Sequence, residues 1–189
     1  AFSQLDKPML TWLASPVLAG IYGAAHRVIE AGLLPLTALL AAAYRRHFQA
    51  GERGLDESHS FALRMLPLSF ATAALSALAL WLGAPLLPMV LGSDYAQVVP
   101  AVRILAALIL LRGVLGPIAD ALTGAGMQAQ RTAIQCIALF VNLLLNLTLI
   151  PDYGIHGAIT ATLVSTLMMC LLASFIHILA RRKQGRSLP

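Results

Sequence analysis

The sequence predicts an all-α polytopic membrane protein, and both its composition and its charge distribution indicate this fold class. Of the 189 residues, 59% are hydrophobic and only 11% are charged. In soluble domains about 45–50% of residues are apolar and about 25% are charged, so a water-soluble enzyme is excluded. The mean hydropathy is +0.80, and several uncharged stretches match the roughly 20 apolar residues that span a bilayer. These stretches are 8–26, 65–93, 132–151 and 153–180.

The first half of the chain contains one shortened span and two full spans. Ser15 and Pro16 end the first span, and the second span meets a polar stretch at 45–60. Gly83 and Pro85 end the third span, because glycine and proline interrupt helices. We place these spans at about 1–15, 20–44 and 61–83.

The second half of the chain contains three more spans after a loop at 84–99. Gly124 and Gly126 close the fourth span, and Pro151 and Gly154 close the fifth. Apolar residues do not alternate within the spans, which argues against β-barrel strands. We place these spans at about 100–122, 132–150 and 157–180, in a transmembrane domain over 1–183 that is followed by a cytoplasmic tail at 184–189.

Basic and non-basic connections alternate along the chain, which predicts the orientation of the spans. The connections 45–64 and 123–131 and the C-terminal tail carry Lys or Arg, whereas 84–99 and 151–156 carry none. Because cytoplasmic loops are enriched in Lys and Arg, we expect the basic connections and the C-terminus on the cytoplasmic side of the inner membrane. The net charge of +5 is thereby explained without a nucleic-acid partner. The basic residues are Arg45, Arg46, Arg53, Arg64, Arg131, Arg181, Arg182, Lys183 and Arg186.

We expect no catalytic site, no metal site and no cofactor. Cys136 and Cys170 fall inside apolar spans, where cysteine behaves as a small hydrophobic residue. An integral membrane enzyme, such as a sugar polymerase or an acyltransferase, would need catalytic acids or histidines beside a substantial loop. The outer loops are short, and we expect no two histidines to pair. The first apolar segment begins at Ala1 without a signal peptide, so we expect the chain to be part of a longer protein.

Ionisable residues inside the spans are the candidate functional residues, because such residues usually face a bundle interior or a watery cavity. Arg27 and Glu30 lie at i and i+3 in the second span. They indicate either a polar cavity wall or an Arg–Glu pair that satisfies itself. Asp6 and Lys7 in the first span lie at a membrane depth similar to that of Arg27 in the second span, because each is about ten residues from the turn that joins the two spans. We therefore expect an Asp6–Arg27 or a Lys7–Glu30 contact.

Arg112 is the best single candidate for substrate contact in the fourth span. It lies near the middle of the span and shares a helix stripe with Gly116 and Asp120. A buried Arg112–Asp120 ion pair is the open alternative. Arg103 lies half a turn out of phase and near the outer interface, where an arginine side chain can snorkel, so we interpret it as structural.

Asparagines and prolines inside the spans add two further expectations. Asn142 and Asn146 lie at i and i+4 in the fifth span, and they either line a cavity or join helices. We expect Pro35, Pro67 and Pro117 to kink their helices without breaking them. Arginines outnumber carboxylates in the spans, and a cavity with spare guanidinium groups suits an anionic substrate such as a diphosphate or an acidic sugar.

Several motifs resemble those of a known transporter family. The sequence NLLLNLTLIP at 142–151 with GIHGA at 154–158 resembles the fifth-to-sixth helix hairpin in the C-terminal lobe of polysaccharide transporters. LDKPML at 5–10 and GIYGAAHR at 20–27 resemble the start of that lobe, and LGSDY at 91–95 resembles its Gly-x-x-Tyr outer loop. These transporters belong to the MOP superfamily and comprise the O-antigen and teichoic-acid types of lipid-linked oligosaccharide flippase.

The resemblance implies a two-lobed helical bundle, of which this chain is about the second lobe, with a central cavity that opens to alternate sides. It implies translocation of undecaprenyl-diphosphate-linked oligosaccharide, such as an O-antigen repeat of lipopolysaccharide, without ATP hydrolysis. The implied partners are this substrate, membrane lipids, the missing N-terminal lobe and polysaccharide assembly machinery. Cationic residues line the cavity in this family, and Arg27 falls in the matching second-helix motif, whereas Arg112 matches no motif.

Two alternatives within the superfamily stay open. One is a lipid II flippase with a similarly basic cavity, and the other is a drug or cation exporter, for which spare carboxylates would be expected. Ion coupling needs a carboxylate that is neutral in one state, so Asp6, Glu30 and Asp120 are the candidate coupling residues. The candidate substrate-binding residues are Arg27, Arg112, Glu30, Asn142 and Asn146.

Overall fold

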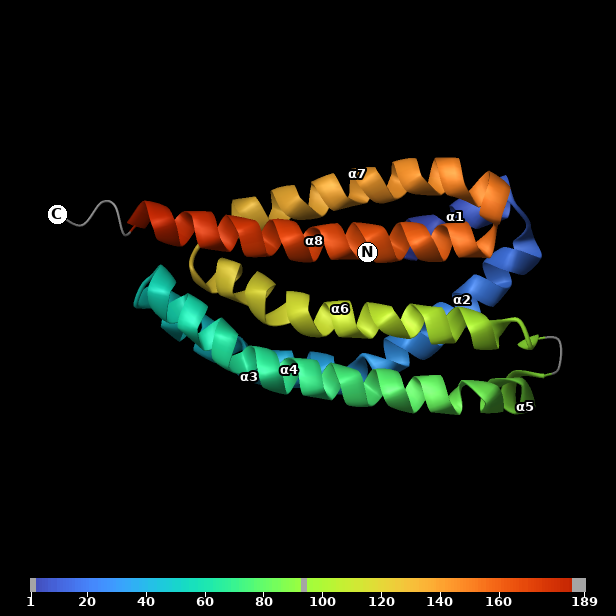
Figure 1. The fold of residues 1–189 in the computed structure, drawn as a ribbon, viewed down its shortest axis with the longest axis horizontal. Coiled ribbons are helices and arrows are strands. Elements are labelled where there is room, and N and C mark those ends of the chain that lie inside the picture. Colours follow the sequence, from blue (N-terminus) through green and yellow to red (C-terminus); the bar gives the residue numbers. More distant parts are fainter. Residues whose placement is uncertain (1–2, 93–94, 185–189) are drawn as a thin grey trace.

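The computed structural model describes residues 3–92 and 95–184, and within them it confirms the predicted all-α fold. Long helices run antiparallel along one axis, and short connections join them at both ends (Figure 1). A 3₁₀ turn, η1 (Ala84–Leu86), follows the fourth helix. The helices are α1 (Ser3–Leu13), α2 (Pro16–Gly32), α3 (Leu34–Glu52), α4 (Leu55–Gly83), α5 (Leu87–Leu91), α6 (Val98–Gly124), α7 (Gln128–Tyr153) and α8 (Ile155–Gln184).

The helices account for the predicted spans. Among the described residues, 4 helices are long and apolar enough to cross a membrane, and the bent pair α2–α3 raises this number to 5 if it counts as one span. α1 has only 11 residues, so it covers part of a bilayer, as expected for a shortened first span. Residues 185–189 of the predicted tail, and Ser93 and Asp94 of the predicted outer loop, lie outside the described residues.

The antiparallel arrangement gathers the basic connections at one end of the molecule. The α3–α4 turn, the α6–α7 turn and the end of α8 lie together at the left of Figure 1, and the α1–α2 turn, α5 and the α7–α8 turn lie at the right. This is the separation of loops that the alternating charge pattern predicts. The side of the membrane that each end faces stays a prediction.

The stretch 45–60 was expected to be a polar loop, and this expectation is wrong. α3 continues to Glu52 and α4 begins at Leu55, so that only Arg53 and Gly54 form the turn. Gly54 has a φ of 118°, a conformation that favours glycine. Charged residues on the outer face hide the helical period of the buried face, which in α3 consists of Ala43, His47 and Ala50.

Of the three prolines expected to kink their spans without breaking them, Pro35 lies at a break, and for Pro35 the expectation is wrong. α2 and α3 meet at Leu33 with a bend of 46°. Pro35, near the start of α3, has no backbone N–H to donate to the carbonyl of Ala31, so the helix cannot continue unchanged through this point. Pro67 and Pro117 lie inside the uninterrupted helices α4 and α6, as expected.

α6 is the central helix of the lobe. It packs against α2, α3, α4 and α8, and half of its most apolar stretch is buried, compared with 17% for that of the segment Leu55–Met89. The α4–α6 contact is close because Gly113 has no side chain: a Cβ atom there would lie 2.6 Å from the Cβ of Ala73. The hydroxyl of Ser69 donates to the carbonyl of Gly113 at 2.7 Å across the same contact.

Two other glycines bring α3 and α6 together at the end of the lobe that carries the basic turns. A Cβ atom on Gly51 would lie 2.0 Å from the carbonyl oxygen of Gly124. A Cβ atom on Gly124 would lie 2.4 Å from the carbonyl oxygen of His47. At this end the two helices therefore meet through their backbones.

Large apolar side chains point outward along the spans, as side chains that face lipid do. They lie on α4, α7 and α8, so the outer faces of these helices are apolar, as are the faces that pack in the core. Among the most exposed are Leu75 at 71%, Leu171 at 64%, Phe140 at 61% and Phe175 at 59%.

We expect Gly113→Ala to destabilise the lobe by about 1–3 kcal/mol, because the added methyl group overpacks the α4–α6 contact. The measurement is thermal unfolding of the protein in detergent. Gly20→Ala is the matched control, because a Cβ atom there meets nothing within 4 Å. Equal unfolding midpoints for the two variants would show that the α4–α6 contact is not tightly packed.

Candidate functional site

A buried polar network centred on Asp6 joins four helices. Asp6 is fully buried at 0% exposure, and its carboxylate accepts hydrogen bonds from three side chains. The hydroxyls of Tyr22 and Thr162 each donate to Oδ2 at 2.8 Å, and Nδ2 of Asn146 donates to Oδ1 at 2.6 Å. The donors lie on α2, α8 and α7, so one carboxylate of α1 connects all four helices.

The network extends from Asp6 in two directions. Nδ2 of Asn146 also donates to Oδ1 of Asn142 at 3.2 Å, and Nδ2 of Asn142 donates to the hydroxyl of Ser165 at 3.4 Å. On α2, Nε2 of His26 lies 2.9 Å from the Tyr22 hydroxyl. Both asparagines are fully buried. In this structure they join helices, and neither lines the cavities described below.

The expectation of an Asp6–Arg27 or a Lys7–Glu30 contact is wrong. Among the described residues neither pair forms an ion pair, and Arg27 and Glu30 do not pair with each other. Both of these side chains are exposed. α1 meets the face of α2 that carries Tyr22, and Arg27 lies about 140° around the helix axis from that face. The functional roles assigned to Arg27 and Glu30 stay predictions.

Arg112 lies between two cavities. One, of about 190 Å³, is lined by α3, α6, α7 and α8, and the other, of about 280 Å³, is lined by α1, α6, α7 and α8. Both cavities share Arg112, Gln135 and Met169. The Nε atom of Arg112 is buried and has no hydrogen-bond partner among the described residues. The side chain therefore has unused donor capacity at the cavity wall.

Asp120 pairs with Arg131 instead of forming the alternative ion pair with Arg112. Oδ1 of Asp120 lies 3.3 Å from Nη1 of Arg131, and the same nitrogen donates to the hydroxyl of Thr123. Arg131, a residue of a basic connection, thereby also ties the start of α7 to the end of α6. Gly116 and Asp120 line the 190 Å³ cavity together with Arg112, as the helix stripe predicts. Asp120 and Arg131 compensate each other, whereas Arg112 has no ion pair within the described ranges.

Two further polar contacts lie away from the network and the cavities. The guanidinium of Arg103 lies 4.8 Å from the ring centroid of Trp81, which agrees with its structural interpretation. Nδ1 of His59 lies 2.9 Å from Nδ1 of His177, so the expectation that no two histidines pair is wrong. His59 belongs to the stretch that is helical instead of loop-like, and α4 thereby carries it to the end of α8.

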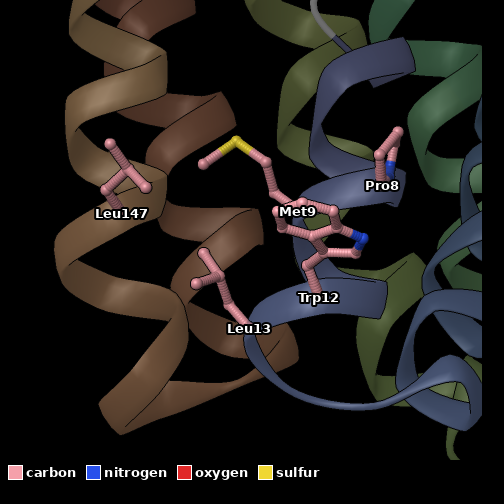
Figure 2. Close-up of a pocket in the computed structure, with 5 residues that line it drawn as sticks. All are labelled: Pro8, Met9, Trp12, Leu13 and Leu147. Carbon is pink, nitrogen blue, oxygen red and sulfur yellow. The ribbon is translucent and has the colours of Figure 1, made fainter.

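An apolar groove lies between α1 and α7 on the outside of the lobe (Figure 2). Its volume is about 310 Å³, and it offers no charged group. Trp12, which is 93% exposed, stands at its edge. A groove of this kind suits hydrocarbon and does not form part of the polar site. The lining residues are Pro8, Met9, Trp12, Leu13 and Leu147.

The hydroxyl groups that surround Asp6 are not among the site residues predicted from the sequence. Tyr22, Thr162 and Ser165 carry no charge, so a search for ionisable residues in the spans passes over them. Two patterns in the sequence indicate buried polar faces. Tyr22 and His26 share one face of α2 at i and i+4. Thr162, Ser165 and Thr166 form a buried polar stripe on α8.

We expect Asp6→Ala to lower the free energy of unfolding by about 1–3 kcal/mol, because three buried donors lose their acceptor. Thermal unfolding in detergent measures the effect. Asp152→Ala removes an exposed carboxylate and should change stability by no more than about 0.5 kcal/mol. A variant without the Asp6 carboxylate that is as stable as the wild type would show that the network does not hold the four helices together.

The chain matches no model of a known protein family and no curated protein sequence. Among solved structures, it is similar to an outward-facing multidrug resistance MATE family transporter of the MOP superfamily. The TM-score is 0.79 with 14% sequence identity, over 98% of this chain and 44% of the transporter. The chain thus spans less than half the length of that transporter, and at this identity the similarity shows the fold alone. It has the fold of one lobe of a MOP-type transporter and is a multi-pass membrane protein.

Proposed function

We propose that this chain is one lobe of an exporter or flippase that moves polyprenyl-diphosphate-linked oligosaccharide across the cytoplasmic membrane by alternating access. The observation that carries this proposal is Arg112, which lies between two cavities without an ion pair among the described residues. The lobe-like fold supports transport as the activity, and the sequence motifs support a lipid-linked substrate. A second lobe completes the cavity, and the basic connections and the C-terminus face the cytoplasm.

The charges along the cavities favour an anionic substrate. Arg131 and Asp120 neutralise each other, so Arg112 gives the lining a net positive charge. A guanidinium group pairs with phosphate or carboxylate through two parallel hydrogen bonds, and the attraction is stronger where water is excluded. The diphosphate that links lipid and sugar has this chemistry. Lipid II carries the same diphosphate, so a lipid II flippase is a variant of the proposal with a different sugar.

A drug or cation exporter is the second candidate, and the observation that supports it is that the similar transporter is a multidrug resistance protein. A cationic substrate needs a carboxylate at the cavity wall. Asp120 is in that position, but its charge is already paired with Arg131. A cation would therefore have to displace Arg131 before it could bind there.

We assign ion coupling to Asp6 from among the three candidate carboxylates. Glu30 is exposed and Asp120 is paired with Arg131, whereas Asp6 is buried and accepts hydrogen bonds from neutral donors alone. A proton or a sodium ion at Asp6 would neutralise a charge that three other helices hold in place. Binding and release of the ion would therefore change how firmly α1 is attached to the lobe.

We expect Arg112→Gln to slow translocation of a labelled polyprenyl-diphosphate oligosaccharide by at least about tenfold, because a lost hydrogen bond to a charged group costs about 1.5–3 kcal/mol. The assay uses the complete protein in proteoliposomes. Arg27→Ala is measured in parallel as the second predicted cationic residue. Arg103→Gln is the control, because Arg103 lies over Trp81, and it should transport like the wild type.

Normal transport by Arg112→Gln would remove Arg112 from the substrate path. Failure of the wild-type protein on this substrate, together with transport of a lipophilic cation, would establish the drug-exporter alternative.

We expect Asp6→Asn to abolish the response of transport to an imposed proton or sodium gradient, because an amide cannot take up a proton or neutralise a cation. Glu30→Gln and Asp120→Asn should keep the response. Initial transport rates are measured with each gradient imposed separately. A response that survives in Asp6→Asn but is lost in Glu30→Gln would move the coupling site to Glu30.

A further inference from the structure

We infer that His26 and Tyr22 form a proton relay that delivers the coupling proton to Asp6. This inference rests on the proposed coupling role of Asp6 and extends it, because it identifies the coupling ion as a proton and names its route. The three side chains lie in one buried line, with 2.9 Å from His26 Nε2 to the Tyr22 hydroxyl and 2.8 Å from that hydroxyl to Asp6 Oδ2. Both distances are those of hydrogen bonds along which a proton can move.

The available protons fix the direction of the hydrogen bonds. An ionised carboxylate can only accept, so the single proton of the Tyr22 hydroxyl is donated to Asp6. The Tyr22 oxygen is then an acceptor toward His26, and Nε2 of His26 must carry a proton. The donors along the line therefore all point from His26 toward Asp6.

A proton crosses this line in two coupled transfers. The Tyr22 hydroxyl passes its proton to Oδ2 of Asp6, and Nε2 of His26 passes its proton to the Tyr22 oxygen. Tyr22 is unchanged at the end, Asp6 is a neutral acid, and an imidazolium at His26 has become a neutral imidazole with its remaining proton on Nδ1. One proton has moved, and no atom other than hydrogen has changed its bonds.

The surrounding charges favour transfer in this direction. Burial disfavours an imidazolium at His26, as do the positive charges of Lys7 on α1 and Arg112 on α6, whereas the Asp6 carboxylate attracts a proton. On α2 itself, Glu30 is exposed one turn after His26. α4 and α8 contribute no Asp, Glu, Lys or Arg between 65 and 83 or between 155 and 180.

The other donors to Asp6 cannot replace this route. Thr162 donates to Oδ2, but its hydroxyl lies 3.0 Å from the Tyr22 hydroxyl, so a path through Thr162 leads back to Tyr22. Asn146 donates through an amide nitrogen, which does not give up its proton. Among the groups bonded to Asp6, Tyr22 alone leads on to a side chain that can bind and release a proton near neutral pH.

The test follows protonation of Asp6 directly, by time-resolved infrared difference spectroscopy of the complete protein in detergent after a downward pH jump. Every carboxylate that takes up a proton contributes a carboxylic acid band, so the Asp6 signal is the part of the band that forms in the wild type and is missing in Asp6→Asn. It should form at least about tenfold more slowly in Tyr22→Phe and in His26→Gln, because a positioned proton donor accelerates transfer by about 100-fold or more. Tyr44→Phe and His156→Gln are matched controls at exposed positions and should keep the wild-type rate.

The outcomes separate the relay from the proposed role of Asp6. Wild-type rates in both Tyr22→Phe and His26→Gln would overturn the relay and leave coupling at Asp6 in place. Identical bands in the wild type and in Asp6→Asn would overturn the coupling role of Asp6 and the relay with it. If either variant fails to fold, the rate of Asp6 protonation in the wild type is compared between D₂O and H₂O. A slower rate in D₂O supports proton transfer along the hydrogen bonds, and equal rates overturn the relay.

Discussion

A buried carboxylate without an ion-pair partner in the described part of the chain constrains the arrangement of the whole lobe. Asp6 lies on a helix of only 11 residues, and an ionised carboxylate in hydrocarbon is costly unless polar groups replace the lost water. Hydroxyls from α2 and α8 and an amide from α7 replace it. Each of these helices must keep its rotation and its distance from α1 for the charge to be tolerated. The order of helices around α1 therefore depends on the oxygen atoms of one residue as well as on apolar packing.

The sequence predicts the all-α fold and the positions of the long apolar helices well, and it predicts the break between α2 and α3 and the helix ends less well. Uncharged stretches of sufficient length occur because a bilayer excludes charge, and this constraint acts along an entire span. The ends of helices are set by local contacts. His47 and Ala50 are buried on one face of α3, but the arginines on the other face make the same stretch look like a loop. α7 likewise continues through Pro151 to Tyr153, where an end at 150 was expected.

The candidate site could be predicted through its charges but not through its neutral members. Asp6 and Arg112 are conspicuous because each is an ionisable residue in an apolar span, and Gly116 and Asp120 follow from the helical period. The threonines show why the rest could not be found. Thr160 donates to the carbonyl of His156 in its own helix, whereas Thr162, two residues later, donates to Asp6. A hydroxyl in a membrane helix can always bond to its own backbone, so its identity alone does not reveal a partner on another helix.

The contact between Gly51 and Gly124 gives α3 one end that cannot adjust. Side chains between two helices can change rotamer when the helices slide, but two backbones in direct contact cannot, and their atoms would overlap after a small displacement. The residues of α3 that line the 190 Å³ cavity, Leu36, Thr37 and Leu40, lie toward its other end, next to the bend at Leu33. α3 therefore has a fixed pivot at the basic end of the lobe, whereas at the cavity wall it is held by side chains such as Leu36 and Leu40, which can change rotamer. A rotation of α3 about this pivot would widen or narrow the cavity beside Arg112 while the far end of the helix stays closed.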